Sequence, residues 1–319
     1  MKKSFYIFYP RSNTHSMFVD YLLADLNIEN YLILPIRKTH HKDAFKKNNH
    51  LTFFERIKYF KEFKEISSNF KSFNLVMVLP FFYRIPSNKS KFLFFEEGLS
   101  TYQDFFLENY KFRFSDKLKD LAKLFFVSCL TNNIILKNIL LGPIYHRNPN
   151  VQNIFNIYTI KPFLINKKYF KHLKIKAFNI TPKSPKLFNN KKKILIINPL
   201  INNNNIDFNE FTIFIKNFSF DEIKIHPNDL ISSHIILHKF KSEISSTIKI
   251  CTDSIEEKLL QNDPIELIGL NSSLLFYAKT IFGIKTSSLA VEYSIIDKNF
   301  KKELLSRYGS INNFSQIFN

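Results

Sequence analysis

Residues 91–102 read Lys-Phe-Leu-Phe-Phe-Glu-Glu-Gly-Leu-Ser-Thr-Tyr, an apolar run that ends abruptly in two carboxylates and a glycine. The apolar half is typical of a buried strand. In open α/β sheets, ligands bind in the crevice outside the carboxyl ends of the strands, so Glu96 and Glu97 stand where a site is expected. Gly98 allows a sharp turn or a close approach to a ligand. The alternative is an acidic, solvated turn without function.

The rest of the chain alternates strand and helix patterns, which predicts a mostly parallel sheet in each half of the protein. In the first half we expect strands at 5–9, 31–34, 75–79 and 91–95, and helices at 16–23, 53–66 and 111–141, the last with doubtful continuity at Asn132–Asn133. In the second half we expect strands at 194–197, 222–225, 247–251 and 280–284, and helices at 208–218, 255–261, 264–267 and 274–278, with mixed helix from 289 on. A Lys- and Pro-rich stretch, 180–193, separates the halves, so we predict α/β domains at 1–185 and 186–319 with a cleft between them.

The amino-acid composition indicates which kinds of binding partner and which cellular compartment to expect. The chain has 319 residues, enough for two domains, and a net charge of +19. This charge favours polyanions such as nucleic acid, anionic lipid or sialylated glycans as binding partners.

Cys129 and Cys251 lack the spacing of metal ligands and indicate a reducing compartment. The apolar start ends at Pro10, too early for a signal peptide, and polar residues interrupt 121–141, a poor membrane span. We therefore expect a cytoplasmic protein, with peripheral contact to an anionic inner membrane allowed by its charge.

Three short motifs stand at predicted strand ends or helix starts: 96–98, His226–Pro227 and Ser272–Ser273. A carboxylate in one domain and a histidine in the other can form an acid–base pair across a cleft. Free N–H groups at a helix start, preceded by hydroxyl residues, can bind a phosphate. Singly each motif is weak, because paired Ser before a helix is most often only a cap. Together they predict group transfer from a phosphate-activated donor.

The three motifs, in this order, resemble those of bacterial sialyltransferases, and most closely those of the lipooligosaccharide sialyltransferase family, glycosyltransferase family 52. Residues 95–102 and the segment 264–267 carry the resemblance further. It implies a GT-B-like fold with two Rossmann-like domains facing each other across a cleft, an acceptor-side N-terminal domain and a nucleotide-sugar-binding C-terminal domain. It also implies an inverting, metal-independent enzyme without a cofactor. The donor would be CMP-N-acetylneuraminic acid (CMP-Neu5Ac), and the acceptor a terminal sugar, such as a galactoside, of a lipooligosaccharide or capsular glycan.

The resemblance assigns roles to individual side chains. Glu97 would be the general base that takes the proton from the acceptor hydroxyl, and Glu96 would orient it. His226 would bind the CMP phosphate and protonate the leaving group, a role that suits a side chain that can be charged near neutral pH. Ser272 and Ser273 would donate hydrogen bonds to the phosphate.

Four further residues complete the substrate-binding set implied by the resemblance. Glu266 would contact the ribose or the cytosine, and the others are Gly98, Pro227 and Asn271. The chain departs from some family members in the loop 198–207, where an acid is missing at the position nearest the turn. Asp207 is the alternative base there. The resemblance also allows a homodimer.

Two other functions remain open at this point. The first is a glycosyltransferase of the same family that uses another donor, such as a UDP-hexose. The second is a basic nucleic-acid-binding protein. Against the second, the aromatic residues mostly follow core patterns, and the sequence contains no RNA-binding signature, so we expect no nucleic-acid partner.

Overall fold

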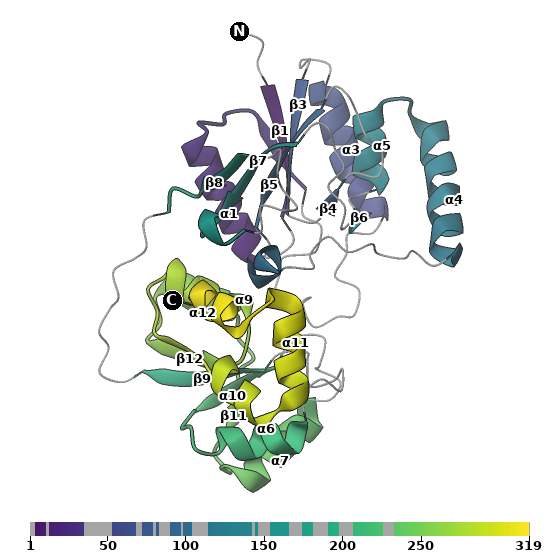
Figure 1. Cartoon of the computed structure of the whole chain (residues 1–319). Helices are drawn as coiled ribbons and strands as arrows, with labels where there is room; N and C mark the ends of the chain where they lie inside the picture. Colours follow the sequence, from purple (N-terminus) through teal and green to yellow (C-terminus); the bar gives the residue numbers. More distant parts are fainter. Residues whose placement is uncertain are drawn as a thin grey trace.

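The computed structural model describes residues 4–10, 13–34, 53–67, 72–78, 81–82, 90–96, 98–103, 114–141, 144–145, 154–165, 174–180, 191–197, 207–225 and 233–318. These residues form two parallel sheets, one in each half of the chain, with helices packed around them (Figure 1). The predicted α/β class is therefore confirmed. Two Rossmann-like sheets in succession give the protein a GT-B-like architecture.

The first sheet has six parallel strands in the order β2-β1-β3-β5-β7-β8. Its strands are β1 (Ser4–Tyr9), β2 (Tyr31–Ile33), β3 (Ser72–Val78), β5 (Ser90–Phe95), β7 (Ile154–Thr159) and β8 (Lys174–Ala177). Its helices are α1 (Asn13–Asp25), α3 (Phe53–Ser67), α4 (Phe114–Leu130) and α5 (Ile134–Leu141), with the 3-10 turns η1 (Gly98–Tyr102) and η2 (Pro162–Leu164). A separate antiparallel pair joins β4 (Phe81–Phe82) to β6 (Ile144–Tyr145). The strand β5 lies between β3 and β7, and its buried side chains explain the continuous apolar run in the sequence.

The second sheet has five parallel strands in the order β11-β10-β9-β12-β13. Its strands are β9 (Lys192–Ile197), β10 (Glu222–Ile225), β11 (Lys249–Ile250), β12 (Ile265–Gly269) and β13 (Thr286–Ser288). Its helices are α6 (Phe208–Ile215), α7 (Ser233–Glu243), α8 (Ile255–Gln261), α9 (Ser273–Thr280), α10 (Ala290–Ile296), α11 (Lys298–Tyr308) and α12 (Ile311–Phe318). The strand order reverses between β9 and β12, and such a switch point is where α/β sheets bind ligands.

Two predicted elements of the second half are wrong. The segment 264–267, expected to open a helix, contains the start of β12, whose residues are all buried between β9 and β13. The segment 280–284, expected to be a strand, lies at the end of α9 and in the turn after it, at Gly283 with φ +63°. The strand itself comes later, as β13. Short apolar runs fit both a buried strand and a buried helix, so the periodicity could not decide.

The predicted interruption at Asn132–Asn133 is confirmed. Helix α4 ends at Leu130, and the side chain of Asn133 accepts a hydrogen bond from the Leu136 N–H at 3.2 Å, inside the first turn of α5. The predicted domain boundary at 185/186 falls between β8 and β9, in residues that the structure does not describe, and it stays a prediction. Among the described residues, no helix combines the length and the apolar character that crossing a membrane requires.

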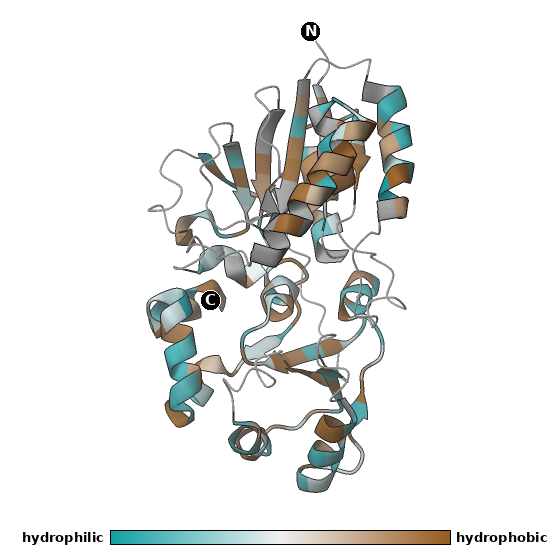
Figure 2. Ribbon diagram, turned by 90° about the vertical axis from the view of Figure 1, so that its right-hand side faces the viewer, coloured by the Kyte–Doolittle hydropathy of each residue, from teal (hydrophilic) through white to brown (hydrophobic). Residues whose placement is uncertain are grey.

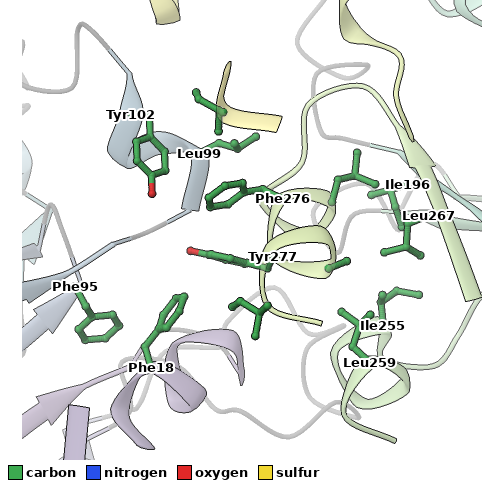
Figure 3. Close-up of a cluster of buried hydrophobic side chains, with 14 of the residues drawn as sticks. Phe18, Phe95, Leu99, Tyr102, Ile196, Ile255, Leu259, Leu267, Phe276 and Tyr277 are labelled. Carbon is green, nitrogen blue, oxygen red and sulfur yellow. The ribbon is translucent and has the colours of Figure 1, made fainter. Parts of the chain in front are cut away.

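The apolar core continues from one domain into the other. Helix α9 of the second domain packs its aromatic side chains against the first domain (Figure 3). The rings of Phe18 and Tyr277 are 5.3 Å apart between centroids, and those of Tyr102 and Phe276 are 5.7 Å apart. Apolar residues concentrate along the strands of both sheets (Figure 2). The amino-terminal half of α9 is therefore fixed against the turn that follows β5.

Candidate active site

Glu96, the first carboxylate after β5, is fully buried and bound inside the protein. Its Oε2 atom accepts a hydrogen bond from the Tyr102 hydroxyl at 2.6 Å and another from the Ile160 N–H at 2.7 Å. The Tyr102 hydroxyl in turn accepts from the Lys161 N–H at 3.2 Å and lies 3.3 Å from the Thr159 hydroxyl. Glu96 thus ties the end of β5 to the end of β7, and a substrate sugar cannot reach its carboxylate.

The ionisation of Glu96 is balanced near neutral pH. Burial raises the pKa of the Glu96 carboxyl to about 7, although the hydrogen bonds from Tyr102 and Ile160 favour the charged form. The hydroxyl of Tyr277 lies close enough to Glu96 for burial and the carboxylate together to raise the Tyr277 pKa well above its usual value. Glu96 Oε1 and the Tyr277 hydroxyl have no hydrogen-bond partner of normal geometry among the described residues. Glu96 Oε1 can therefore take up a proton beside the Tyr277 hydroxyl.

Gly98 brings the first motif into contact with the third. It has φ +70°, a conformation that glycine adopts without strain, and it opens the turn η1. A Cβ at this position would lie 2.3 Å from Ser273 Oγ and 2.5 Å from Ser273 Cβ. The next residue, Leu99, donates its N–H to Ser273 Oγ at 3.1 Å. The acid-acid-Gly turn of one domain and the Ser-Ser helix start of the other therefore meet, as the predicted interdomain site requires.

The amino end of α9 lies at the switch point of the second sheet. Strand β12 ends at Gly269, where a Cβ would lie 2.9 Å from the carbonyl oxygen of Ile196 in β9. After Asn271, Ser272 caps α9, and its Oγ accepts from the Leu274 N–H at 3.2 Å. A hydroxyl that accepts one hydrogen bond can still donate its own proton. Helix N–H groups and serine protons at this edge suit an anion such as a phosphate.

Two other predicted site carboxylates have partners of their own. Asp207 is the N-cap of α6, and its Oδ1 accepts from the N–H groups of Asn209 at 2.7 Å and Glu210 at 3.2 Å. Glu266 lies three residues before the end of β12 and pairs with Lys285 at 2.9 Å. These contacts give both carboxylates structural roles. Their predicted roles, as alternative base and as nucleotide ligand, stay predictions.

The family comparison names the class of the protein. A model of the alpha-2,8-polysialyltransferase family matches residues 27–291, which is most of the chain. The chain belongs to this alpha-2,8-polysialyltransferase family. It is therefore a glycosyltransferase with sialyltransferase activity, and it uses a nucleotide-sugar donor and a glycan acceptor. The predicted class is confirmed, while the narrower assignment to glycosyltransferase family 52 stays a prediction.

Other comparisons add little to the family match. A search of curated proteins finds no match. Among solved structures, MurG of Acinetobacter baumannii is similar over 95% of this chain and 83% of its own, with 9% sequence identity and a TM-score of 0.30. The fold assignment therefore rests on the two sheets and their strand orders.

Three predicted residues of this family member lie outside the described part of the chain. Glu97 stands in the sequence between Glu96 and Gly98, which are both placed, and His226–Pro227 directly follow the last residue of β10. Strands β9, β10 and β12 are parallel, so their carboxyl ends share the edge at which α9 begins. Within the described residues, no group of three His, Cys, Asp or Glu side chains is placed to hold a metal ion.

Sequence patterns assigned no role to two tyrosines that build this site. Tyr102 binds Glu96 and packs on Phe276, and Tyr277 lies between Phe18 and Glu96. Tyr102 belongs to the quoted stretch 91–102, so its place in the motif was a signal. Tyr277 fitted the apolar pattern of its helix, and nothing in the sequence distinguished it from a core residue.

Proposed function

We propose that this sialyltransferase moves N-acetylneuraminic acid from CMP-Neu5Ac to the terminal sugar of a lipooligosaccharide or capsular glycan. The reaction is a single inverting displacement that needs neither a metal ion nor a cofactor. The observation that carries the proposal is the contact of Gly98 with Ser273. It joins a turn that follows two carboxylates in one domain to a helix start suited to a phosphate in the other.

The donor binds at the second domain. Serine protons of Ser272 and Ser273, with the N–H groups and the dipole of α9, hold the CMP phosphate. His226 contacts the same phosphate as an imidazolium, with Pro227 and Asn271 beside the nucleotide. Glu266, whose carboxylate pairs with Lys285, is the further contact that we assign to the ribose or the cytosine.

The acceptor is activated from the first domain. Because Glu96 is buried and hydrogen-bonded within the protein, Glu97 is the carboxylate of the pair that we assign as general base. Glu97 takes the proton of the acceptor hydroxyl while the acceptor oxygen bonds to C2 of the sialyl residue. The bond from C2 to the phosphate oxygen breaks on the opposite side, and CMP leaves with a proton from His226. Asp207 is the second choice for the base.

The family description supports a first choice of acceptor sugar. It names an α2,8 linkage and a polymer, which favours a terminal sialic acid over other acceptors. The motif resemblance points instead to a galactoside, which is our second choice. We locate the reaction at the cytoplasmic side of an anionic membrane, where a basic enzyme meets lipid-linked acceptors.

Two assays test this proposal. A thermal-shift panel with CMP, CDP, UDP and a short oligonucleotide at moderate salt should show selective stabilisation by CMP. Stabilisation by UDP alone would contradict the sialyl donor, and stabilisation by the oligonucleotide alone would favour a nucleic-acid-binding protein. Product analysis with labelled CMP-Neu5Ac, with lactose and sialyllactose as acceptors and with and without EDTA, then identifies the acceptor and tests independence from metal ions.

A further inference from the structure

Helix α4 presents large apolar side chains to solvent. It packs on α5, with Val127 buried and Leu124 half-buried. In Figure 1 it forms the outer edge of the first domain, with α5 between it and α3. Five of its large apolar side chains are between 51% and 75% exposed, namely Leu118, Leu121, Phe125, Phe126 and Leu130. We call these five residues the α4 outer face.

The α4 outer face is continuous. Leu118, Leu121 and Phe125 are three or four residues apart, so they lie next to one another along the helix, on the side opposite Val127. Ala122 and Cys129, both exposed, lie between these three residues and Phe126 on the helix surface. Single exposed apolar residues are ordinary, but contiguous apolar patches of this kind mark interaction surfaces.

The charge distribution indicates what covers this face. Residues 1–185 contain 30 of the 46 Lys and Arg residues but only 13 of the 27 Asp and Glu residues, so this part carries +17 of the net +19. Residues 186–319 carry only +2. A helix that exposes Leu and Phe on a strongly basic domain matches an anionic bilayer surface, where apolar side chains enter the acyl boundary and cations meet phosphates.

Two other occupants fit less well. A nucleic acid would match the charge of the first domain but would leave the apolar side chains of α4 in water. A second copy of the chain would cover these side chains, but docking through this face would bring together two domains that each carry +17. The bilayer is the occupant that satisfies both the apolar and the basic character.

We propose that α4 is a membrane-docking helix whose outer face inserts into the surface of a bilayer that contains anionic lipid. With 17 residues, α4 is about 25 Å long, and it lies along the surface instead of crossing it. The proposal goes beyond the proposed function, because it assigns the contact with lipid to one helix and does not depend on the donor or the acceptor.

The absence of tryptophan from the chain allows a direct test. The variant Phe125→Trp carries a single tryptophan on the α4 outer face, and Phe54→Trp carries one at an exposed position of α3. With vesicles of phosphatidylcholine and phosphatidylglycerol, the emission of Phe125→Trp should shift to the blue and be quenched by brominated lipid. The emission of Phe54→Trp should not change. No shift for Phe125→Trp, or an equal shift for both variants, would overturn the proposal.

A second test uses charge-matched variants in co-sedimentation with the same vesicles. The pair Leu121→Glu with Phe125→Glu should weaken binding at least about tenfold, because two large apolar side chains no longer enter the bilayer. The control pair Phe54→Glu with Ile235→Glu also replaces two exposed apolar residues by acids and should change binding less than about twofold.

Three results of this second test would contradict the proposal. They are no binding of the wild-type chain to these vesicles, equal binding by the α4 pair and the wild type, and a wild-type dimer in light scattering that the α4 pair converts to a monomer. In the last case a second copy covers the face. Circular dichroism and thermal unfolding, measured on each variant, confirm that it is folded.

Discussion

Replacement of Glu96 by glutamine should stabilise the protein above neutral pH. The carboxyl has an ordinary pKa of 4.5 in the unfolded chain and a pKa of about 7 when buried in the folded protein. Between these two values the folded state retains a proton that the unfolded state has lost, so stability falls as the pH rises and is level above the folded pKa. Ionisation of the buried carboxyl therefore lowers the free energy of unfolding at pH 8.5 by about 3 kcal/mol.

The glutamine side chain of this variant would keep the existing contacts of the carboxylate. An amide oxygen in place of Oε2 accepts from Tyr102 and Ile160, and the amide NH₂ in place of Oε1 can donate to the Tyr277 hydroxyl. Glu96→Gln should therefore melt higher than the wild type at pH 8.5, by roughly 5 °C, with little difference at pH 4.5. The control Glu210→Gln removes an exposed carboxylate of α6. A Glu96→Gln variant that melts lower than the wild type at pH 8.5 would refute this reasoning.

Other predictions concern the contact between the two domains and the donor site. Gly98→Ala should lower the free energy of unfolding by more than about 2 kcal/mol in urea denaturation, since it adds a clash with Ser273 to the cost of φ +70°, while Gly283→Ala, at φ +63°, should show the backbone cost alone. An equal loss of stability in the two variants would show that a side chain at position 98 does not clash with Ser273. Ser273→Ala should cost about 1–3 kcal/mol because it leaves the Leu99 N–H without its partner, and Ser272→Ala about 1 kcal/mol as a lost cap. Both should also raise the KM for CMP-Neu5Ac, and an unchanged KM would limit both serines to structural roles. His226→Ala should weaken CMP binding in calorimetry as well as turnover; loss of turnover with full CMP affinity would separate His226 from the phosphate.

The sequence predicted most strands because parallel strands buried on both faces form continuous apolar runs. Strands β1, β5 and β9 followed this rule, whereas β10 alternates charged and apolar residues, Glu222-Ile223-Lys224-Ile225. Strand β8 was missed because Lys174 and Lys176 interrupt it, so that it resembled the basic stretch that follows. Strand β12 was taken for a helix because Pro264 precedes a short apolar run, a pattern that fits both structures.

The candidate site was predictable as a set of motifs but not as a geometry. Gly98 and Ser273 are 175 positions apart in the chain, and only the order of the motifs suggested that they meet. Which of two adjacent glutamates is buried depends on contacts made by Tyr102 and by the backbone at Ile160. Such contacts form only when β5 and β7 pair, so the sequence alone could not assign the two carboxylates different roles.

The most direct test of the account compares the two glutamates as catalysts. Initial rates of sialyl transfer from CMP-Neu5Ac are measured for Glu96→Gln and Glu97→Gln at one pH, with CMP affinity measured on the same samples. We predict that Glu97→Gln loses about 100-fold or more in kcat with CMP affinity retained, as for a lost general base, and that Glu96→Gln keeps most of its turnover. Normal turnover in Glu97→Gln, or an equal loss in a stably folded Glu96→Gln, would contradict the account.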